Sequence, residues 1–190
     1  MRYFAIALLA MIIGGCASDP AKRAAVAEEE VARYLPSTKS LAEFRDYQLK
    51  PITMSPDIME DEDKVKVSQQ LGTKLSDRIT PLLGKWRADK EKTTMGSILI
   101  IEPKVQRLRI VSRAARFWLG AFMGESFIDM DLKLTDSATA QVIAIPRIHR
   151  SVGSMVGAWS IGATDRNLLD YIVDIAHHYL EVNYTLKATE

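Results

Sequence analysis

The amino-acid sequence predicts an α+β sandwich, because two segments with the period of a helix enclose a run of segments with the period of a strand. Residues 64–89 and 165–183 carry apolar side chains at three- and four-residue steps, which gives each segment one apolar face. Residues 97–148 contain short apolar runs and alternating stretches that are typical of strands. Strands that lie together between helices favour an α+β fold.

The first 16 residues, MRYFAIALLAMIIGGC, have the pattern of a secretory signal. Arg2 supplies the positive charge, residues 4–13 form a short apolar run, and two glycines precede the chain's single cysteine. The run is shorter than the roughly 20 apolar residues that span a membrane. A signal that ends on cysteine resembles the lipobox of bacterial lipoproteins. This resemblance implies that residues 1–15 are removed and that Cys16 is lipidated, with palmitate among its acyl chains.

Residue 17 is alanine, and lipoproteins without an aspartate at this position are sorted to the outer membrane in the resembled class. We therefore expect an outer-membrane lipoprotein that faces the periplasm and contacts the membrane through Cys16. Residues 16–40 are predicted to be its lipidated tether. Pro20 suits the start of a helix, and alanine, glutamate and basic residues follow it. The apolar stripe is thin, so we interpret this segment as a short tethering helix or a solvated spacer.

Residues 41–185 are predicted to form a single periplasmic domain, a usual length for one domain. Removing Arg2 from the 25 basic residues leaves 24, equal to the 24 acidic residues. A neutral chain lacks the basic footprint of a nucleic-acid-binding protein, so no nucleic-acid partner is expected. Without a second cysteine there is no disulfide and no cysteine-based metal site.

The first strand and the first long helix follow the tether. Residues 44–54 alternate roughly in polarity and include Pro51, which predicts an edge strand. Residues 57–63 are acidic and favour the start of the next helix, because carboxylates stabilise its N-terminus; they lack the spacing of a calcium loop. Within residues 64–89, Pro81 predicts a kink or a break. The expected core face consists of Val67, Leu71, Leu75, Ile79, Leu82, Leu83 and Trp86.

The next strands carry the one local basic cluster. Residues 97–101, SILII, are short and apolar enough for a buried strand, which Glu102 and Pro103 are expected to interrupt. Residues 105–111 then alternate, with their arginines facing outward. The candidate anion-contact residues are Arg107, Arg109, Arg113 and Arg116. The alternative is a solvated strand face.

An unusual stretch, RFWLGAFMG, occupies residues 116–124 and combines aromatic residues with glycines that permit sharp turns. Its apolar side chains either pack over a sheet end or form a partner surface. A further aromatic residue lies in the glycine-rich loop 151–163. The candidate partner-surface residues are Phe117, Trp118, Phe122 and Trp159.

Residues 127–134 are the clearest strand, with Ile128, Met130, Leu132 and Leu134 on one side. Asp129 and Asp131 fall on the other side and are expected to face solvent. A polar turn at 135–140 and a strand at 141–148 complete a hairpin, whose Pro146 indicates a strand end or a sheet edge. Thr164 is predicted to cap the last helix. The apolar face of that helix consists of Leu168, Leu169, Ile172, Ile175, Ala176 and Tyr179.

Motifs for catalysis or for metal binding are not found. His177 and His178 are adjacent, so they point about 100° apart on a helix and do not chelate one ion together. Ser151 and Ser154 lack the GxSxG spacing of a nucleophile elbow. Two solvent-facing carboxylates do little acid–base work. The sequence therefore predicts a protein that is not an enzyme and has no cofactor and no metal.

Turn-forming residues carry a resemblance to a known family. Gly120 and Gly124 before a strand, the turn 136–139 (DSAT), the glycine-rich loop and the helix led by Asp165 resemble a family of uncharacterised bacterial envelope lipoproteins. The chain is more distantly similar to the periplasmic domains of the curli-secretion lipoprotein and of lipoproteins that activate peptidoglycan synthases. The resemblance covers residues 64–184. Ala140 and Ala158 stand where the family has glycine.

This resemblance implies a two-layer sandwich with a mainly antiparallel sheet of four or five strands, covered by two main helices. It brings no catalytic residues. We therefore expect a non-catalytic protein-interaction module in cell-envelope assembly or maintenance, with an envelope protein as its partner. One alternative is an oligomeric secretion channel similar to the curli exporter, in which the chain is a homo-oligomer. Another is a small-ligand-binding lipoprotein with a pocket between Phe117, Trp118 and the glycine-rich loop.

Overall fold

The computed structural model describes residues 19–88, 96–110, 125–152 and 163–185. The predicted lipidation site Cys16 lies outside these residues, as do all four aromatic candidates and two of the four arginines. Those positions are Phe117, Trp118, Phe122, Trp159, Arg113 and Arg116. The predictions made for them stay predictions.

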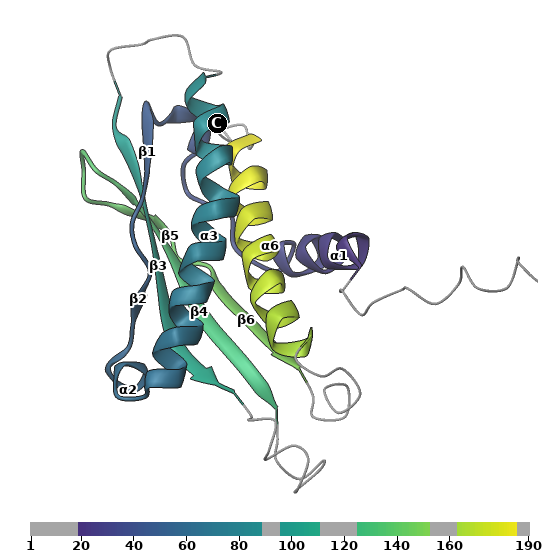
Figure 1. The fold of residues 1–190 in the computed structure, drawn as a ribbon. Helices are drawn as coiled ribbons and strands as arrows, with labels where there is room; N and C mark the ends of the chain where they lie inside the picture. Colours follow the sequence, from purple (N-terminus) through teal and green to yellow (C-terminus); the bar gives the residue numbers. More distant parts are fainter. Residues whose placement is uncertain (1–18, 89–95, 111–124, 153–162, 186–190) are drawn as a thin grey trace, which may run out of the picture.

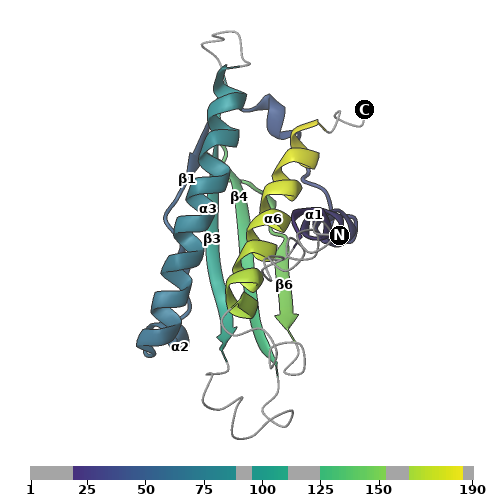
Figure 2. The same ribbon diagram turned by 45° about the vertical axis from the view of Figure 1, so that its right-hand side comes forward.

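The structure is an α+β sandwich in which a mixed six-stranded sheet forms one layer and the long helices form the other (Figures 1 and 2). The central strands β3 and β4 are antiparallel; β1 and β2 run parallel to β3, while β5 and β6 run antiparallel to β4. The fold class is therefore confirmed. The strands are β1 Asp46–Leu49, β2 Thr53–Met54, β3 Ile98–Arg109, β4 Ser126–Asp136, β5 Val142–Ala144 and β6 Arg147–Val152.

Two long helices cover one face of this sheet side by side, and a third packs beside them (Figure 1). Helix α3 crosses β1 and β3, and helix α6 lies over β4 and β6. Helix α1 contacts α6. The helices are α1 Pro20–Val31, η1 Leu41–Glu43, α2 Pro56–Met59, α3 Glu62–Ala88 and α6 Ala163–Thr185. Both predicted main helices are confirmed, and their expected apolar faces lie in the core.

Prolines divide both edges of the sheet, which explains why it has six strands rather than four or five. Pro51 separates β1 from β2, and Pro146 separates β5 from β6. Proline has no amide proton to donate to a neighbouring strand, so it ends a ladder or sits at an edge. The edge positions predicted for residues 44–54 and for Pro146 are therefore confirmed, with each edge built from two short strands.

Pro103 and Pro81 do not interrupt the elements that contain them, contrary to what the sequence predicts for Pro103 and to the break that it allows at Pro81. Pro103 does not interrupt β3, which runs from Ile98 to Arg109. It falls between Ile101, the last partner of β1, and Lys104, the first partner of β2, so no parallel strand stands opposite it to need its amide. Pro81 lies on the exposed side of α3, and the helix continues past it to Ala88.

The segment from Pro20 onward is packed against the domain and is not a solvated spacer. Ala27 and Val31 of α1 are buried, and Arg23 Nε lies 2.8 Å from an Asp174 carboxylate oxygen of α6. The chain that follows α1 is also fixed, because the Ser37 amide donates to the side chain of buried Asn183 over 2.6 Å. The folded domain therefore begins before residue 41.

The turn between β4 and β5 holds an alanine in a backbone conformation that favours glycine. Ala140 has a φ of +56°, in the left-handed region that glycine adopts without cost. The Asp136 carboxylate accepts the Ala138 amide at 3.0 Å, and the Asp136 amide donates to the Gln141 carbonyl at 2.9 Å. This tight turn holds Ala140 in a conformation that glycine would adopt without strain.

We expect Ala140→Gly to raise the free energy of unfolding by about 0.5–1 kcal/mol. A left-handed alanine costs roughly 1–2 kcal/mol, and the greater freedom of glycine in the unfolded chain offsets about 0.4–1 kcal/mol of the gain. Urea denaturation measures the change. Ala138→Gly in the same turn is the matched control, because residue 138 has no positive φ to relieve and should be neutral or destabilised. Equal destabilisation by both glycines would contradict the strain at residue 140.

Candidate functional site

The face of the sheet that the long helices leave uncovered carries a dense set of charged side chains. In both views the helices lie on the same side of the sheet (Figures 1 and 2). On the other side, the Arg107, Arg147 and His149 side chains are 72%, 70% and 56% exposed. We define the open sheet face by the residues Lys104, Arg107, Asp129, Asp131, Arg147 and His149.

The first row of the open sheet face is centred on Asp129 of β4. Arg107 and His149 are its register partners on β3 and β6. Arg107 Nε donates to one carboxylate oxygen at 2.5 Å, and His149 Nδ1 lies 2.5 Å from the other. The Asp129 side chain is only 3% exposed, because these two partners cover it. The row is therefore a buried carboxylate under an exposed guanidinium and an exposed imidazole.

The second row is centred on Asp131, two residues further along β4. Arg147 Nε donates to one of its oxygens at 2.9 Å, and Gln106 Nε2 donates to the other at 2.7 Å. The hydrogen bond to Asp131 raises the pKa of Arg147 above its usual value, so the guanidinium stays charged. Lys104 is the register neighbour of Asp131 and forms no ion pair within the described residues. Its ammonium therefore remains available at this face.

A β-bulge brings the two rows onto one face. The β3–β4 register shifts between Val105 and Arg107, so Gln106 is an extra residue. Without the bulge, Lys104 and Arg107 would point to opposite faces, because side chains alternate along a regular strand. The bulge therefore places Lys104 and Arg107, which are three residues apart in the sequence, on the same face of the sheet.

Asp129 and Asp131 were expected to be exposed to solvent, and this expectation was wrong. Both lie on the side of β4 away from the helices, as alternation predicts, yet both are buried. Long side chains from β3 and β6 fold over them and occupy their oxygens. Alternation gives the face of a residue, whereas burial on an open face depends on the neighbouring strands.

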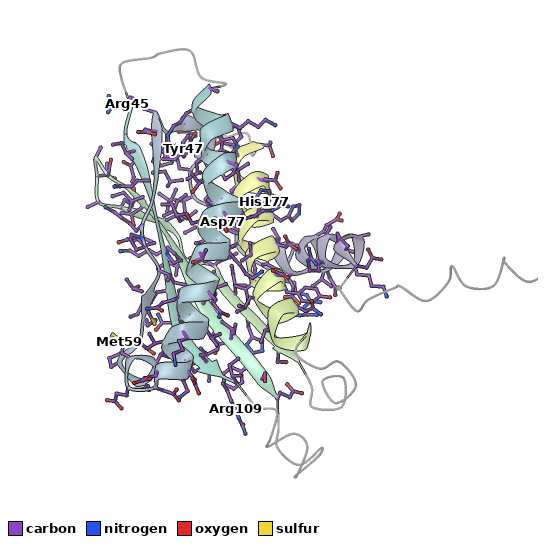
Figure 3. The ribbon with its side chains drawn as sticks, viewed as in Figure 1. Arg45, Tyr47, Met59, Asp77, Arg109 and His177 are labelled. Carbon is purple, nitrogen blue, oxygen red and sulfur yellow. The ribbon has the colours of Figure 1, made fainter. Side chains whose placement is uncertain are left out.

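The predicted anion-contact residues are partly placed. Arg107 and Arg109 are exposed on β3, and Arg109 lies near the lower end of the sheet in Figure 3. Sequence reasoning missed Lys104, Arg147 and His149. The alternation of Arg147, His149 and Ser151 with Ile148 was a signal for the last strand. Its alignment beside the arginines of β3 depends on long-range pairing and could not be read locally.

A second group of charged residues lines a groove of about 520 Å³ between α1 and α6. The Asp174 carboxylate of α6 accepts a hydrogen bond from Arg23 Nε of α1 at 2.8 Å. Its other oxygen lies 3.9 Å from Arg78 Nε of α3, so Asp174 connects three helices. His177 lies 3.1 Å from Glu181 on the next turn of α6. Figure 3 shows His177 in the helical layer, away from the open sheet face. We interpret this group as the connection that holds α1 in place.

Stability is expected to fall as the pH drops below about 6.5, the ordinary pKa of histidine. Burial lowers the pKa of His177, against the opposing pull of Glu181 and Asp174, and Arg78 lowers it further. The folded state therefore binds this proton less tightly than the unfolded state, so protonation favours unfolding. Thermal melting from about pH 7.5 to about pH 5.5 should show a smaller loss for His177→Gln than for the natural chain.

The neighbouring His178 provides the control for this prediction, since its side chain is more exposed, at 34% against 14% for His177. His178→Gln should leave the pH dependence close to that of the natural chain. If His177→Gln and the natural chain lose stability in parallel, His177 is not the responsible group.

Two further structural findings concern the described residues alone. Among them, no three or more histidine, cysteine, aspartate or glutamate side chains are grouped so that they could hold a metal ion. In the same ranges, no helix is both long and apolar enough to cross a membrane.

Comparison with known proteins gives distant structural likenesses. No protein-family model and no curated protein match the chain. Two solved structures of the PelC dodecamer from Paraburkholderia phytofirmans, one a point variant, share 14% and 12% sequence identity with it. Each likeness covers 78% of this chain and 95% of PelC, with a TM-score of 0.43. A Helicobacter pylori protein, described as a homologue of the neuraminyllactose-binding hemagglutinin, shares 12% identity over 78% of this chain and 96% of its own, with a TM-score of 0.28.

At these identities and TM-scores, the likenesses give the chain neither a function nor an oligomeric state. The predicted membership of an uncharacterised lipoprotein family stays a prediction.

Proposed function

We propose that this chain is a non-catalytic lipoprotein of the bacterial cell envelope that binds a partner protein through its open sheet face. The anchor is Cys16, and the expected location is the periplasmic side of the outer membrane. The observation that carries the proposal is the charged, uncovered face of the sheet. A two-layer domain fills one sheet face with helices, so its other face is free to contact a partner.

The geometry of the Asp129 row supports a binding role over a catalytic one. Both carboxylate oxygens are occupied, one by Arg107 and the other by His149. A catalytic Asp–His pair would present the second ring nitrogen to a nucleophile. In the described part of the chain, no hydroxyl or thiol is hydrogen-bonded to the imidazole ring of His149. The arrangement fixes the orientation of two exposed side chains, which serves recognition.

Exposed charges also suit this role in a tethered protein. Complementary charges accelerate encounter and fix the orientation of two proteins, although rim charges add little affinity. Arg147, Arg107 and Lys104 come from two separate strands, so they form a surface and not a single contact. A partner with acidic groups would be attracted to these cations.

Co-purification of the intact lipoprotein from membranes of its own cells tests the proposal. The natural chain should retain an envelope protein that Lys104→Glu loses, because the substitution places a negative charge on the open sheet face. Lys85→Glu is the matched control, since Lys85 is an exposed residue of α3 on the helical side. Equal retention by both variants would count against the proposed face. Recovery of the chain with copies of itself alone would favour the homo-oligomer.

A further inference from the structure

The two exposed arginines of the open sheet face are held in fixed orientations. Each binds a buried carboxylate through Nε, Arg107 to Asp129 and Arg147 to Asp131. Among the described residues, their terminal Nη groups have no hydrogen-bond partner, and both side chains are at least 70% exposed. A guanidinium that is already oriented loses less entropy on binding an oxyanion. Each arginine can therefore offer its remaining donors to a carboxylate.

The two buried carboxylates already have partners at both oxygens, so the terminal N–H groups of the arginines stay available to a ligand. Asp129 accepts from Arg107 and lies against His149, and Asp131 accepts from Gln106 and Arg147. All four oxygens are engaged, and the Asp129 and Asp131 side chains are only 3% and 12% exposed. An incoming ligand therefore meets the exposed N–H groups of the arginines and the ammonium of Lys104.

The spacing of the rows matches an extended peptide. Asp129 and Asp131 are two residues apart on β4, so the rows are about 6.7 Å apart at 3.3–3.4 Å per residue. Side chains on one side of an extended segment recur at the same interval. A segment with acidic side chains at alternate residues would place one carboxylate at each row.

We infer that the open sheet face binds an extended acidic segment of a partner protein, with carboxylates on alternate residues. This inference rests on the proposed function and states the chemistry of the partner. Planar carboxylates suit the two donors of a guanidinium edge, and the two-residue period suits a polypeptide. Phosphate-bearing ligands share the negative charge but not that period.

Fluorescence anisotropy with the full-length chain in an uncharged detergent tests the inference. The probe is a labelled peptide with glutamate at alternate residues and serine between them. We expect binding that weakens as salt rises, since exposed charges are screened. The double variant Arg107→Gln/Arg147→Gln should weaken binding on the order of 100-fold, because two charge-assisted contacts are lost. Binding that this variant leaves unchanged would overturn the inference.

A second variant covers the case in which the double variant does not fold. Lys104→Gln touches neither buried carboxylate and should weaken binding about threefold, as expected for one exposed charge. Lys85→Gln on α3 should bind like the natural chain. Equal weakening by these two lysine variants would show attraction to overall charge and would also overturn the inference.

Other ligands separate the remaining explanations. A peptide of the same composition with its glutamates in one block should bind more weakly than the alternating peptide. Inorganic phosphate and anionic phospholipid vesicles should compete only weakly; strong competition by either would assign the face to phosphate.

If the peptide fails to bind while Lys104→Glu still loses a cellular partner, the proposed function stands and the acidic segment is wrong. If peptide binding persists without any cellular partner, the proposed function fails instead.

Discussion

Replacing Arg107 and His149 together by leucine is expected to lower the free energy of unfolding by about 3–5 kcal/mol. Both residues contact the carboxylate of Asp129, whose side chain is 3% exposed. Leucine keeps the carboxylate covered but removes its partners, which leaves an uncompensated buried charge. Equilibrium denaturation in urea at neutral pH measures the loss.

Two companion variants show whether the buried charge is the cause. The double alanine variant should cost less than the double leucine variant, because smaller side chains let water reach Asp129. Adding Asp129→Leu to the double leucine variant should restore most of the stability, since an apolar row carries no buried charge. A double leucine variant as stable as the natural chain would contradict the account of this row.

Trp86→Ala is expected to cost about 3–5 kcal/mol of stability, the usual effect of removing a buried aromatic side chain. Trp86 is 4% exposed and stacks on Tyr184 of the C-terminal helix with ring centroids 4.2 Å apart. It also meets Tyr47 of β1 edge to face at 5.1 Å. The indole therefore joins α3, α6 and the first strand at one end of the domain.

Trp86→Phe is the control for this prediction, because it keeps an aromatic ring and should cost clearly less than alanine. Thermal and urea denaturation followed by circular dichroism give both values. At temperatures where each variant is folded, acidic-peptide binding should equal that of the natural chain, since Trp86 lies in the helical layer. A loss of binding in folded Trp86→Phe would show that the helices, and not only the sheet face, form the site.

The sequence predicts the helical layer well because its signal is local. Leu71, Leu75 and Ile79 recur at the helical period, and each is buried in α3. The alternation of Ile128 and Met130 likewise gives the core side of β4. Pro51 and Pro146 correctly indicate edges, because proline has no amide proton to donate to a neighbouring strand. Pro103, in the central strand β3, was wrongly expected to interrupt its strand.

The candidate site was less accessible to sequence reasoning because it depends on contacts between distant segments. Arg107 and Arg147 meet the same central strand from opposite sides, although 40 residues separate them in the numbering. The bulge at Gln106 has no residue signature in the sequence, yet it decides which face Lys104 occupies. The burial of Asp129 follows from these neighbours and not from its own position.

The packing of helix α1 against the domain could not be predicted from its own sequence. Its composition favours a helix, and the structure has one, but its thin apolar stripe indicates a solvated segment. Packing against α6 instead comes from two small contacts, Ala27 and Val31, together with the ion pair of Arg23 with Asp174. A short apolar stripe suffices when a charged group on the neighbouring helix completes the interface.

Site-specific photo-crosslinking in living cells tests the central claim most directly. A crosslinking amino acid replaces Lys104 on the open sheet face in one strain and Asp77, on the helical side in Figure 3, in another. The account predicts an adduct with one envelope protein from position 104 and none from position 77. An adduct from position 77 alone, or the same adduct from both positions, would contradict docking through the open sheet face.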